Sequence, residues 1–295
     1  MKILIVGLTK GIQFERLSEE GKKRGHEVLG SLSSDLIIDT STNEFKPILT
    51  GHDLSSYNLV YSLTSKRRWE WYTAFLYLAE KYKTIIVNKK VIDPTYNYFL
   101  TPAIDYLRQT QNNFQYPRSF LFFSIKFLDN FSGEFKFPII IKRSDGRKGK
   151  GVFKANDMNE LKARASEILK SSLSFVVREF IPNDGDIRVF CVGYKAVGAM
   201  KRTPKIGEFR SNISQGGMGS NFDLNSRADV RELAESVAAV VRTQIAGVDI
   251  MINKETDKPY ILEVNPAPQF EGLEKYTSVN AALEIIKYFE TLQSS

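Results

Sequence analysis

Residues 260–272 read YILEVNPAPQFEG and change from an apolar strand to a polar one at Glu263. Because successive side chains of a strand point to opposite faces, Glu263 and Asn265 should share one face, and Leu262 and Val264 the other. A carboxylate and an amide oxygen would then lie side by side. Two interpretations stay open: the pair binds a hard cation, or it is solvated at a sheet edge.

A second acidic residue occurs in the preceding apolar segment, AGVDIMI at residues 246–252, where Asp249 is the only charge. If the two segments pair through a turn around Thr256 and Asp257, the Asp249 carboxylate approaches that of Glu263. Three oxygen ligands would then converge, as Mg²⁺ requires, with phosphates and waters completing its octahedron. The alternative is that Asp249 and Glu263 lie at solvated sheet edges and that each is paired with a lysine.

Length and composition indicate a globular protein. The 295 residues are enough for two or three packed units, because domains cluster near about 100 to 150 residues. Apolar residues make up 42% and charged residues 25%, which argues against disorder. The apolar runs fall short of the roughly 18 residues that a membrane helix needs, and MKILIVGLTK lacks a signal-peptide pattern. We therefore expect a cytoplasmic protein with no membrane partner, and the single Cys191 fits a reducing compartment.

The formal net charge of +7 raises the question of a nucleic-acid partner. The lysines and arginines are scattered along the chain, however, and a site for polyanionic nucleotides would also use positive charge. Aromatic and basic residues do not interleave in the C-terminal part. We therefore expect no nucleic-acid partner, although charge alone does not decide the question.

The first 92 residues predict a small α/β layer. The opening strand KILIVG ends at Gly7, and a helical stretch from Ile12 to Arg24 is stopped by Gly25. Four short apolar segments follow, HEVLG, DLIID, YNLVYSL and KTIIVN, with the helix-like WEWYTAFLYLAEKY before the last. This alternation favours a mostly parallel sheet. The first turn reads GLTKG and lacks Gly-x-Gly-x-x-Gly, so we predict a scaffold or substrate domain.

Two further units are predicted after this layer. Residues 93–178 combine a helix containing Pro102, the strand FPIIIK, and the amphipathic helix MNELKARASEILK with Asp157 as its N-cap. Residues 179–295 combine a hairpin, DIRVFCVGYKAVGAMKR, with a long helix and the strand pair described above. The predicted domains are therefore 1–92, 93–178 and 179–295.

A glycine-rich basic loop follows the FPIIIK strand. The segment IIIKRSDGRKGKGV places Lys142 at a strand end, followed by Gly146, Gly149 and Gly151. Glycines let the backbone turn N–H groups toward an anion, and a lysine beside them adds a mobile positive charge. The loop is either a phosphate cradle or a hairpin tip with solvated basic residues.

Two more segments carry candidate ligands. In VVREFIPNDGDIRVF a short linker separates two strands, so its backbone could bond a purine edge while Asp186 accepts from ribose hydroxyls. Asp186 and Arg188 share one strand face. In MKRTPKIGEFRSNISQGG, Arg202, Arg210 and Asn212 lie near a glycine pair, and guanidinium groups suit carboxylates and phosphates.

The order of these motifs resembles the ATP-grasp superfamily, and most closely its RimK-type carboxylate–amine ligases. The resemblance covers residues 137–277 and rests on the Lys-Gly loop, REFI, GDIRVFCVG, KR, EFRSNISQGG, GVDIMI and LEVNPAP. It implies an ATP-grasp fold, α/β and α+β, in which two α+β subdomains clamp ATP after a small Rossmann-like α/β domain. Two departures occur. TYNYFLTP lacks the lysine that the family carries there, and Gln269 replaces a glycine.

The resemblance also implies cofactors and residue roles. The cofactors would be ATP and Mg²⁺, or Mn²⁺ in its place. The implied ATP-binding residues are Lys142, Gly146, Gly149, Gly151, Glu179, Phe180, Ile181, Asp186 and Asn212. The residues implied to handle phosphate and the acyl intermediate are Arg188, Arg202 and Arg210. The implied metal ligands are Asp249, Glu263 and Asn265.

The implied reaction forms an amide bond, either peptide or isopeptide. The γ-phosphate of ATP would pass to a small-molecule or peptide carboxylate, and an amine donor such as an amino acid would attack the acylphosphate, releasing phosphate beside ADP. A homo-oligomer would be compatible with this assignment. Two alternatives stay open: a basic nucleic-acid-binding protein, and an ATP-binding regulator that has lost catalysis, which the missing lysine motivates.

Overall fold

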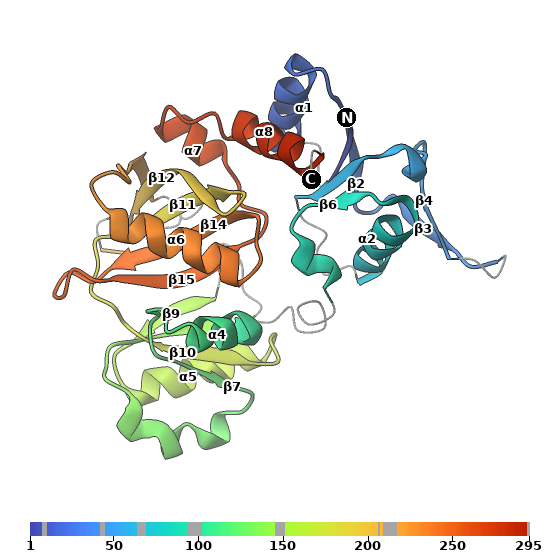
Figure 1. Cartoon of the computed structure of the whole chain (residues 1–295). Coiled ribbons are helices and arrows are strands. Elements are labelled where there is room, and N and C mark those ends of the chain that lie inside the picture. Colours follow the sequence, from blue (N-terminus) through green and yellow to red (C-terminus); the bar gives the residue numbers. More distant parts are fainter. Residues whose placement is uncertain are drawn as a thin grey trace.

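The computed structural model describes residues 1–7, 11–41, 45–63, 69–93, 102–144, 151–205, 207–208 and 217–293. Within these residues the chain forms three main sheets, two of four strands and one of five, and a separate two-stranded hairpin (Figure 1). The main sheets follow one another along the chain, so each belongs to its own unit.

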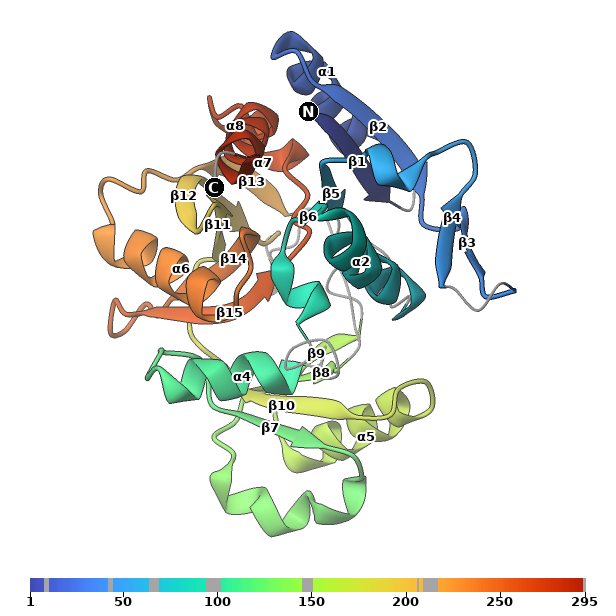
Figure 2. The same ribbon diagram turned by 45° about the vertical axis from the view of Figure 1, so that its right-hand side comes forward.

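The N-terminal unit contains β1 (Lys2–Gly7), α1 (Ile12–Lys23), β2 (Glu27–Leu32), β5 (Leu59–Ser62), α2 (Trp69–Tyr82) and β6 (Ile85–Ile86). Its sheet has the order β2–β1–β5–β6 and is parallel throughout, as the alternation of segments predicts. Strands β3 (Leu36–Asp39) and β4 (Lys46–Leu49) pair as an antiparallel hairpin that projects from this unit (Figure 2). Short 3₁₀ turns at Leu54–Ser56 and Lys89–Ile92 complete it.

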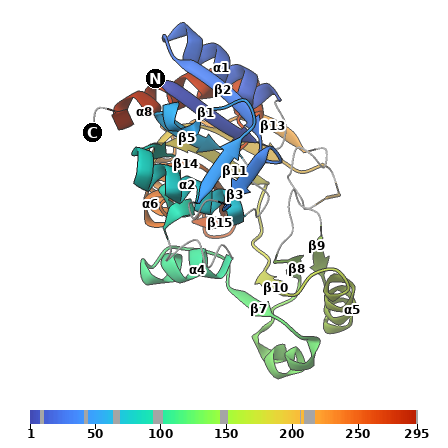
Figure 3. The ribbon, with the colours of Figure 1, turned by 90° about the vertical axis from the view of Figure 1, so that its right-hand side faces the viewer.

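The central unit contains β7 (Ser119–Phe122), β8 (Ile139–Arg143), β9 (Val152–Ala155), α5 (Met158–Leu169) and β10 (Phe175–Glu179), with 3₁₀ turns at Ile125–Phe127 and Asp129–Glu134. Its antiparallel sheet has the order β7–β10–β8–β9. Helix α5 covers one face of this sheet, on the side away from the C-terminal unit (Figure 3). Asp157 caps α5 as predicted, because its Oδ1 accepts a bond of 2.9 Å from the Glu160 N–H.

The C-terminal unit contains β11 (Asp186–Val192), β12 (Lys195–Thr203), β13 (Met218–Asn221), α6 (Ala228–Val240), β14 (Ile245–Ile252), β15 (Pro259–Asn265), α7 (Glu271–Tyr276) and α8 (Ala281–Gln293). Its antiparallel sheet has the order β13–β12–β11–β14–β15. Helix α6 packs on one face through Val230, Ala234 and Val237. The opposite face is therefore the one available to carry polar side chains.

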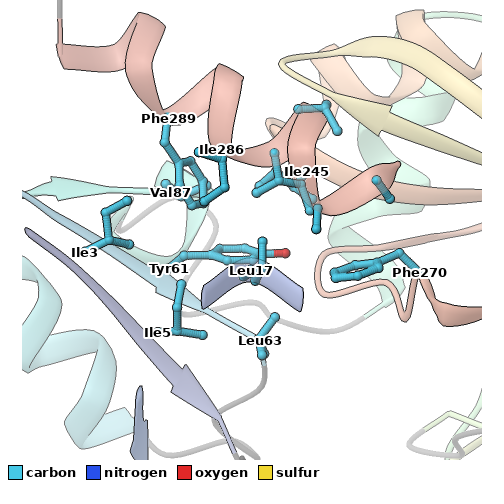
Figure 4. Packing of buried hydrophobic residues seen from close by; sticks show 14 of the residues in the cluster. Ile3, Ile5, Leu17, Tyr61, Leu63, Val87, Ile245, Phe270, Ile286 and Phe289 are labelled. Carbon is cyan, nitrogen blue, oxygen red and sulfur yellow. The ribbon is translucent and has the colours of Figure 1, made fainter. Parts of the chain in front are cut away.

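Helix α8 packs against the N-terminal unit. Its Ile286 and Phe289 pack in one core with Ile3 and Tyr61 of the N-terminal sheet, and with Ile245 of β14 (Figure 4). The Tyr61 and Phe289 rings meet edge to face with centroids 5.7 Å apart. The N-terminal and C-terminal units therefore share a hydrophobic core, which leaves the central unit outside it.

Helix α4 (Pro102–Gln111) lies beside α6, and the segment after it follows β15, where the Ile261 N–H donates to the Gln115 carbonyl at 2.9 Å. The predicted ranges 1–92, 93–178 and 179–295 each contain one main sheet, but this part of the second range packs on the third unit. The exact ranges stay a proposal. No described helix has the length and apolar character to cross a membrane.

Candidate active site

Charged residues form a row across the open face of the C-terminal sheet. The strand register places Asp186 opposite Arg202, Arg188 opposite Asp249, and Asp249 opposite Glu263. Strands β14 and β15 pair as predicted, with Asp257 in the left-handed conformation at their turn. Residues far apart in sequence are thus brought into one row, because cross-strand neighbours on one face lie about 5 Å apart.

Asp249 is at the centre of this row and is only 3% exposed. Arg188 donates from Nε to Oδ1 and from Nη2 to Oδ2, each at 2.7 Å. The Nη2 of Arg202 lies 2.8 Å from the same Oδ2, and Arg202 also forms two bonds of 2.6 Å with Asp186. Two carboxylates and two guanidinium groups form a continuous, electrically balanced chain. Sequence reasoning gave these four residues separate roles and did not predict this chain.

The arginines also set the charge of Asp249. Burial alone would raise the pKa of this carboxyl, but Arg188 and Arg202 more than offset that effect and hold the pKa well below its usual range. Asp249 is therefore ionised at neutral pH, as a metal ligand needs to be.

Glu263 and Asn265 lie on the same face, as predicted, and the Asn265 Nδ2 donates to the Glu263 Oε1 at 3.0 Å. The pairing of β15 with β14, the strand of Asp249, is less regular than expected. The register shifts by one residue, so that Leu262 is an extra residue in β15, while Ile261 and Val264 enter the core under α6. The predicted alternation, in which Leu262 and Val264 share the face opposite Glu263 and Asn265, is interrupted by this bulge, and of these two residues Val264 belongs to the core under α6.

The donor set fits Mg²⁺ or Mn²⁺, since Asp249, Glu263 and Asn265 offer two carboxylates and an amide oxygen on one face. Mg²⁺ commonly takes one or two carboxylates together with substrate phosphates. In the described part of the chain, no three acidic, histidine or cysteine side chains gather as a metal site. The assignment of these three ligands stays a prediction.

Lys142 approaches the same place from the central sheet. It lies on β8 opposite Val176, on the face that α5 does not cover. Burial and the nearby Arg178 lower the pKa of Lys142 to about 7, although Glu263 opposes them. The two sheets meet beside Lys142, because Arg178 on the same face of the central sheet donates to the carbonyl of Leu262, the residue before Glu263.

The glycine-rich loop is described only at its ends. Gly151 has φ +73°, and a Cβ there would come within 2.7 Å of the Arg143 side chain, so glycine is required. Arg143 points away from Lys142 and donates to the Ser171 carbonyl at 3.0 Å. Gly146 and Gly149 lie outside the described residues, so their phosphate role stays a prediction.

The linker between the two sheets is held in a fixed turn. The Asn183 Nδ2 donates to the Ile181 carbonyl at 2.6 Å, and the Gly185 N–H donates to the Asn183 Oδ1 at 2.8 Å. Gly185 has φ +106°, and a Cβ there would collide with the Arg202 carbonyl. The predicted adenine segment begins just before this turn.

The Glu179 side chain has a structural partner. Its Oε1 accepts from the Arg118 N–H at 2.8 Å, while its own N–H donates to the Arg118 carbonyl at 2.9 Å. Phe180 lies under Lys154, with the Nζ 4.4 Å from the ring centroid. An adenine contact at Glu179 would therefore involve its main chain rather than its carboxylate.

Two predicted residues, Arg210 and Asn212, lie outside the described residues, as does most of TYNYFLTP. Gln269, which departs from the family pattern, is exposed beside the buried Phe270. Sequence reasoning also missed Arg178, which is only 6% exposed. The available signal was an arginine at an inward position of the apolar strand FVVRE.

Comparison with known proteins identifies the relatives of the chain. The model of the RimK-like ATP-grasp domain matches residues 110–289. A probable alpha-L-glutamate ligase 1 of Pseudoalteromonas atlantica (strain T6c) is 30% identical over 305 aligned residues, covering 100% of this chain and 96% of that protein.

A probable alpha-L-glutamate ligase of Legionella pneumophila (strain Corby) is 37% identical over 155 residues, which is 52% of this chain and only 50% of that relative's length. The match thus spans about half of the Legionella protein. Among solved structures, the ATP-grasp ligase PsnB complexed with minimal precursor, Mg and ADP aligns with a TM-score of 0.74 at 17% identity, covering 98% of this chain and 96% of that chain. This likeness confirms the predicted ATP-grasp fold.

Proposed function

The chain belongs to the RimK-like ATP-grasp family, and from this we propose that it is an ATP-dependent ligase that joins a carboxylate to an amine. One observation carries the proposal: the face of the central sheet that bears Lys142 meets the C-terminal sheet at β15, where Arg178, on that same face, donates to the carbonyl of Leu262, the residue before Glu263. Nucleotide phosphates need a cation such as Lys142, and Mg²⁺ needs an acid such as Glu263. A nucleotide bound between the sheets would meet both.

The described residues supply the parts of such a site. Bound Mg²⁺ would neutralise phosphate charge, and Asp249, Glu263 and Asn265 would hold it. Lys142 would bind phosphate oxygens. Arg188 uses Nε and Nη2 for Asp249, so its Nη1 remains to bind an anion.

The proposed chemistry proceeds in two steps. A substrate carboxylate oxygen attacks the γ-phosphorus of ATP, the bond to the β–γ bridging oxygen breaks, and ADP leaves. An amine then attacks the acyl carbon, loses a proton, and expels inorganic phosphate as the amide forms. Positioning and charge neutralisation supply most of the catalysis of such transfers, which fits a site built from paired charges.

The substrates are proposed from the relatives. Two of these are named probable alpha-L-glutamate ligases, so glutamate is the first amine to test. The PsnB structure contains a precursor, so a peptide carboxylate is a reasonable acceptor. We keep a small-molecule carboxylate and a homo-oligomeric enzyme as further proposals.

The test is a screen of carboxylate and amine pairs for amine-dependent release of ADP, with mass spectrometry of the product. We expect one pair to give ADP, phosphate and an amide in equal amounts. Hydroxylamine should replace the amine and give a hydroxamate from the same carboxylate. AMP and pyrophosphate would instead indicate adenylation and contradict the acylphosphate route, and salt-sensitive polynucleotide binding without ATP turnover would contradict the ligase.

A further inference from the structure

Arg178 has no role in the proposed chemistry so far, yet it lies where the two sheets meet. It occupies β10 opposite Ser119 and Ile140, on the face of the central sheet that points toward the C-terminal unit. Its side chain is almost fully buried. A buried guanidinium needs several partners, because burying an unpaired charge is costly.

The partners of Arg178 come from three different elements. Its Nε donates to the Ser119 hydroxyl of β7 at 3.0 Å, and its Nη1 donates to the Leu262 carbonyl of β15 at 3.3 Å. Its Nη2 donates to the Tyr106 hydroxyl of α4, and the guanidinium carbon lies 5.7 Å from the Tyr106 ring centroid. A single side chain therefore ties the central sheet to both α4 and β15.

The charge of Arg178 is unusual in this environment. Over the described residues, no carboxylate lies within ion-pair distance of its guanidinium, and the three acceptors above are neutral. Replacing a buried ion pair by well-packed apolar residues is often neutral or stabilising, and a buried charge without an ion pair has still less to offset its desolvation. Stability alone therefore gives a weak reason for an arginine here, and the geometry of its contacts is the stronger reason.

The contact with Leu262 is the informative one. Leu262 is the extra residue of the β15 bulge, and the next residue is Glu263. The peptide bond between them is planar, so a hydrogen bond that fixes the Leu262 carbonyl also fixes the Glu263 N–H and the direction of its Cα. Bulges re-aim side chains next to functional sites.

We propose that Arg178 is a positioning residue for the metal site: by holding the Leu262 carbonyl from the neighbouring sheet, it aims Glu263 into the space in front of Lys142. The proposal rests on the proposed function, since it assumes that nucleotide and Mg²⁺ bind there. The orientation of Glu263 then also depends on the position of the central sheet, because Arg178 belongs to that sheet and donates to the Leu262 carbonyl.

The experiment compares ADP binding with and without Mg²⁺ by titration calorimetry, in wild type, Arg178→Gln and Arg178→Lys. The ratio of the two affinities measures how much the metal adds. Residues that orient metal ligands typically contribute about 10- to 100-fold, so we expect this ratio to fall at least about tenfold in both variants. Arg178→Lys is decisive, because lysine keeps the charge but lacks the fork that reaches Leu262, Ser119 and Tyr106 together.

Three controls accompany the measurement. Arg164→Gln removes a partly exposed arginine of α5, on the other face of the same sheet, and should leave the ratio unchanged. Tyr106→Phe and Ser119→Ala each remove one Arg178 contact but spare the Leu262 contact. They should lower the melting temperature without changing the ratio.

The outcomes separate the two proposals. If wild type binds ADP with metal enhancement and Arg178→Lys keeps that enhancement, the positioning role is wrong and only charge matters. An unchanged ratio in a folded Arg178→Gln has the same consequence. If wild type itself fails to bind ADP, the proposed function fails instead.

Discussion

The two sheet faces that meet at the candidate site balance their charges in different ways. On the C-terminal sheet, Arg188 and Arg202 are bonded to buried aspartates, and the chain of bonds is neutral in sum. On the central sheet, Lys142 and Arg178 share the open face, and the described hydrogen-bond acceptors of Arg178 are neutral.

The two faces therefore differ in when their charges are neutralised: folding neutralises those of one face, and a bound ligand would neutralise those of the other. The four bonded charges of the C-terminal face satisfy one another, so this part of the face is preorganised without nucleotide. The central face carries positive charge that a polyanion would neutralise, in line with the lowered pKa of Lys142. The first face should therefore respond to substitution through stability, and the second through ligand binding.

Asp249→Asn should have the largest effect, because it breaks the balanced face. It leaves Arg188 and Arg202 without their shared anion, and breaking a buried pair typically costs about 3 to 5 kcal/mol. We expect the free energy of unfolding to fall by roughly that amount in urea titrations, and ATP turnover to be lost. Asp257→Asn, in the exposed turn between β14 and β15, is the matched control. If Asp249→Asn has the same free energy of unfolding as wild type, the contrast between the two faces is wrong.

Glu263→Gln should separate catalysis from stability on the same strand. Glu263 is exposed, so its loss should leave the melting temperature nearly unchanged. A metal ligand loses its charge, so turnover should fall about a hundredfold or more and should need more Mg²⁺ to recover. ATP turnover against Mg²⁺ concentration checks this, with the exposed Glu271→Gln as control. Near-normal rates of Glu263→Gln at low Mg²⁺ would show that Glu263 is a solvated edge residue and not a metal ligand.

Lys142 should make nucleotide binding pH-dependent. Its lowered pKa, about 7, means that the ligand-free lysine is mostly neutral at pH 8, whereas bound phosphates favour the charged form. Binding should then take up about one proton at pH 8, and affinity should fall as pH rises above 7. Calorimetry in buffers of different ionisation enthalpy measures this uptake. Lys142→Arg stays charged and should abolish it.

Removal of the Lys142 side chain tests the same phosphate site through binding affinity. Lys142→Ala should weaken ATP binding strongly and leave the fold intact, because no carboxylate of the described residues lies within ion-pair distance of Lys142 and the substitution therefore breaks no salt bridge there. Proton uptake that persists in Lys142→Arg, or unchanged ATP affinity in Lys142→Ala, would remove Lys142 from the phosphate site.

Glu179→Gln should have the smallest effect. Its carboxylate accepts the Arg118 N–H, and the amide oxygen of glutamine can still accept it, so the substitution removes only the charge that strengthens this bond, worth about 1 kcal/mol. ATP affinity, measured by titration, should change less than about threefold, because the main chain remains in place. A large loss of affinity would show that the Glu179 side chain itself binds nucleotide.

Sequence reasoning was most successful where the signal is local. The hairpin of residues 186–202, which turns at Gly193 and Tyr194, and the pairing of β14 with β15 follow from alternation and turn residues, and the structure contains both. The ATP-grasp fold was predicted from a family resemblance that rests on several short motifs in order. Each single motif or turn lies within a short stretch of chain.

The missed features depend on contacts that are distant in sequence. Asp249 meets Arg202 only because β12, β11 and β14 are neighbours in one register, and no local pattern fixes that register. The bulge at Leu262 and the reach of Arg178 depend on two sheets packing together. Side-chain roles assigned residue by residue therefore missed the shared partners.

The core around α8 has a consequence for the order in which the protein can fold. Ile3, Ile5 and Tyr61 are synthesised long before Ile286 and Phe289 of α8, which form part of their buried environment. Helix α1 contributes Leu17 to the same core, but the covering of this face stays incomplete until α8 has been made, and contacts of such long sequence separation form slowly. The face of β1 that carries Ile3 and Ile5 therefore reaches its final burial only when α8 packs on it.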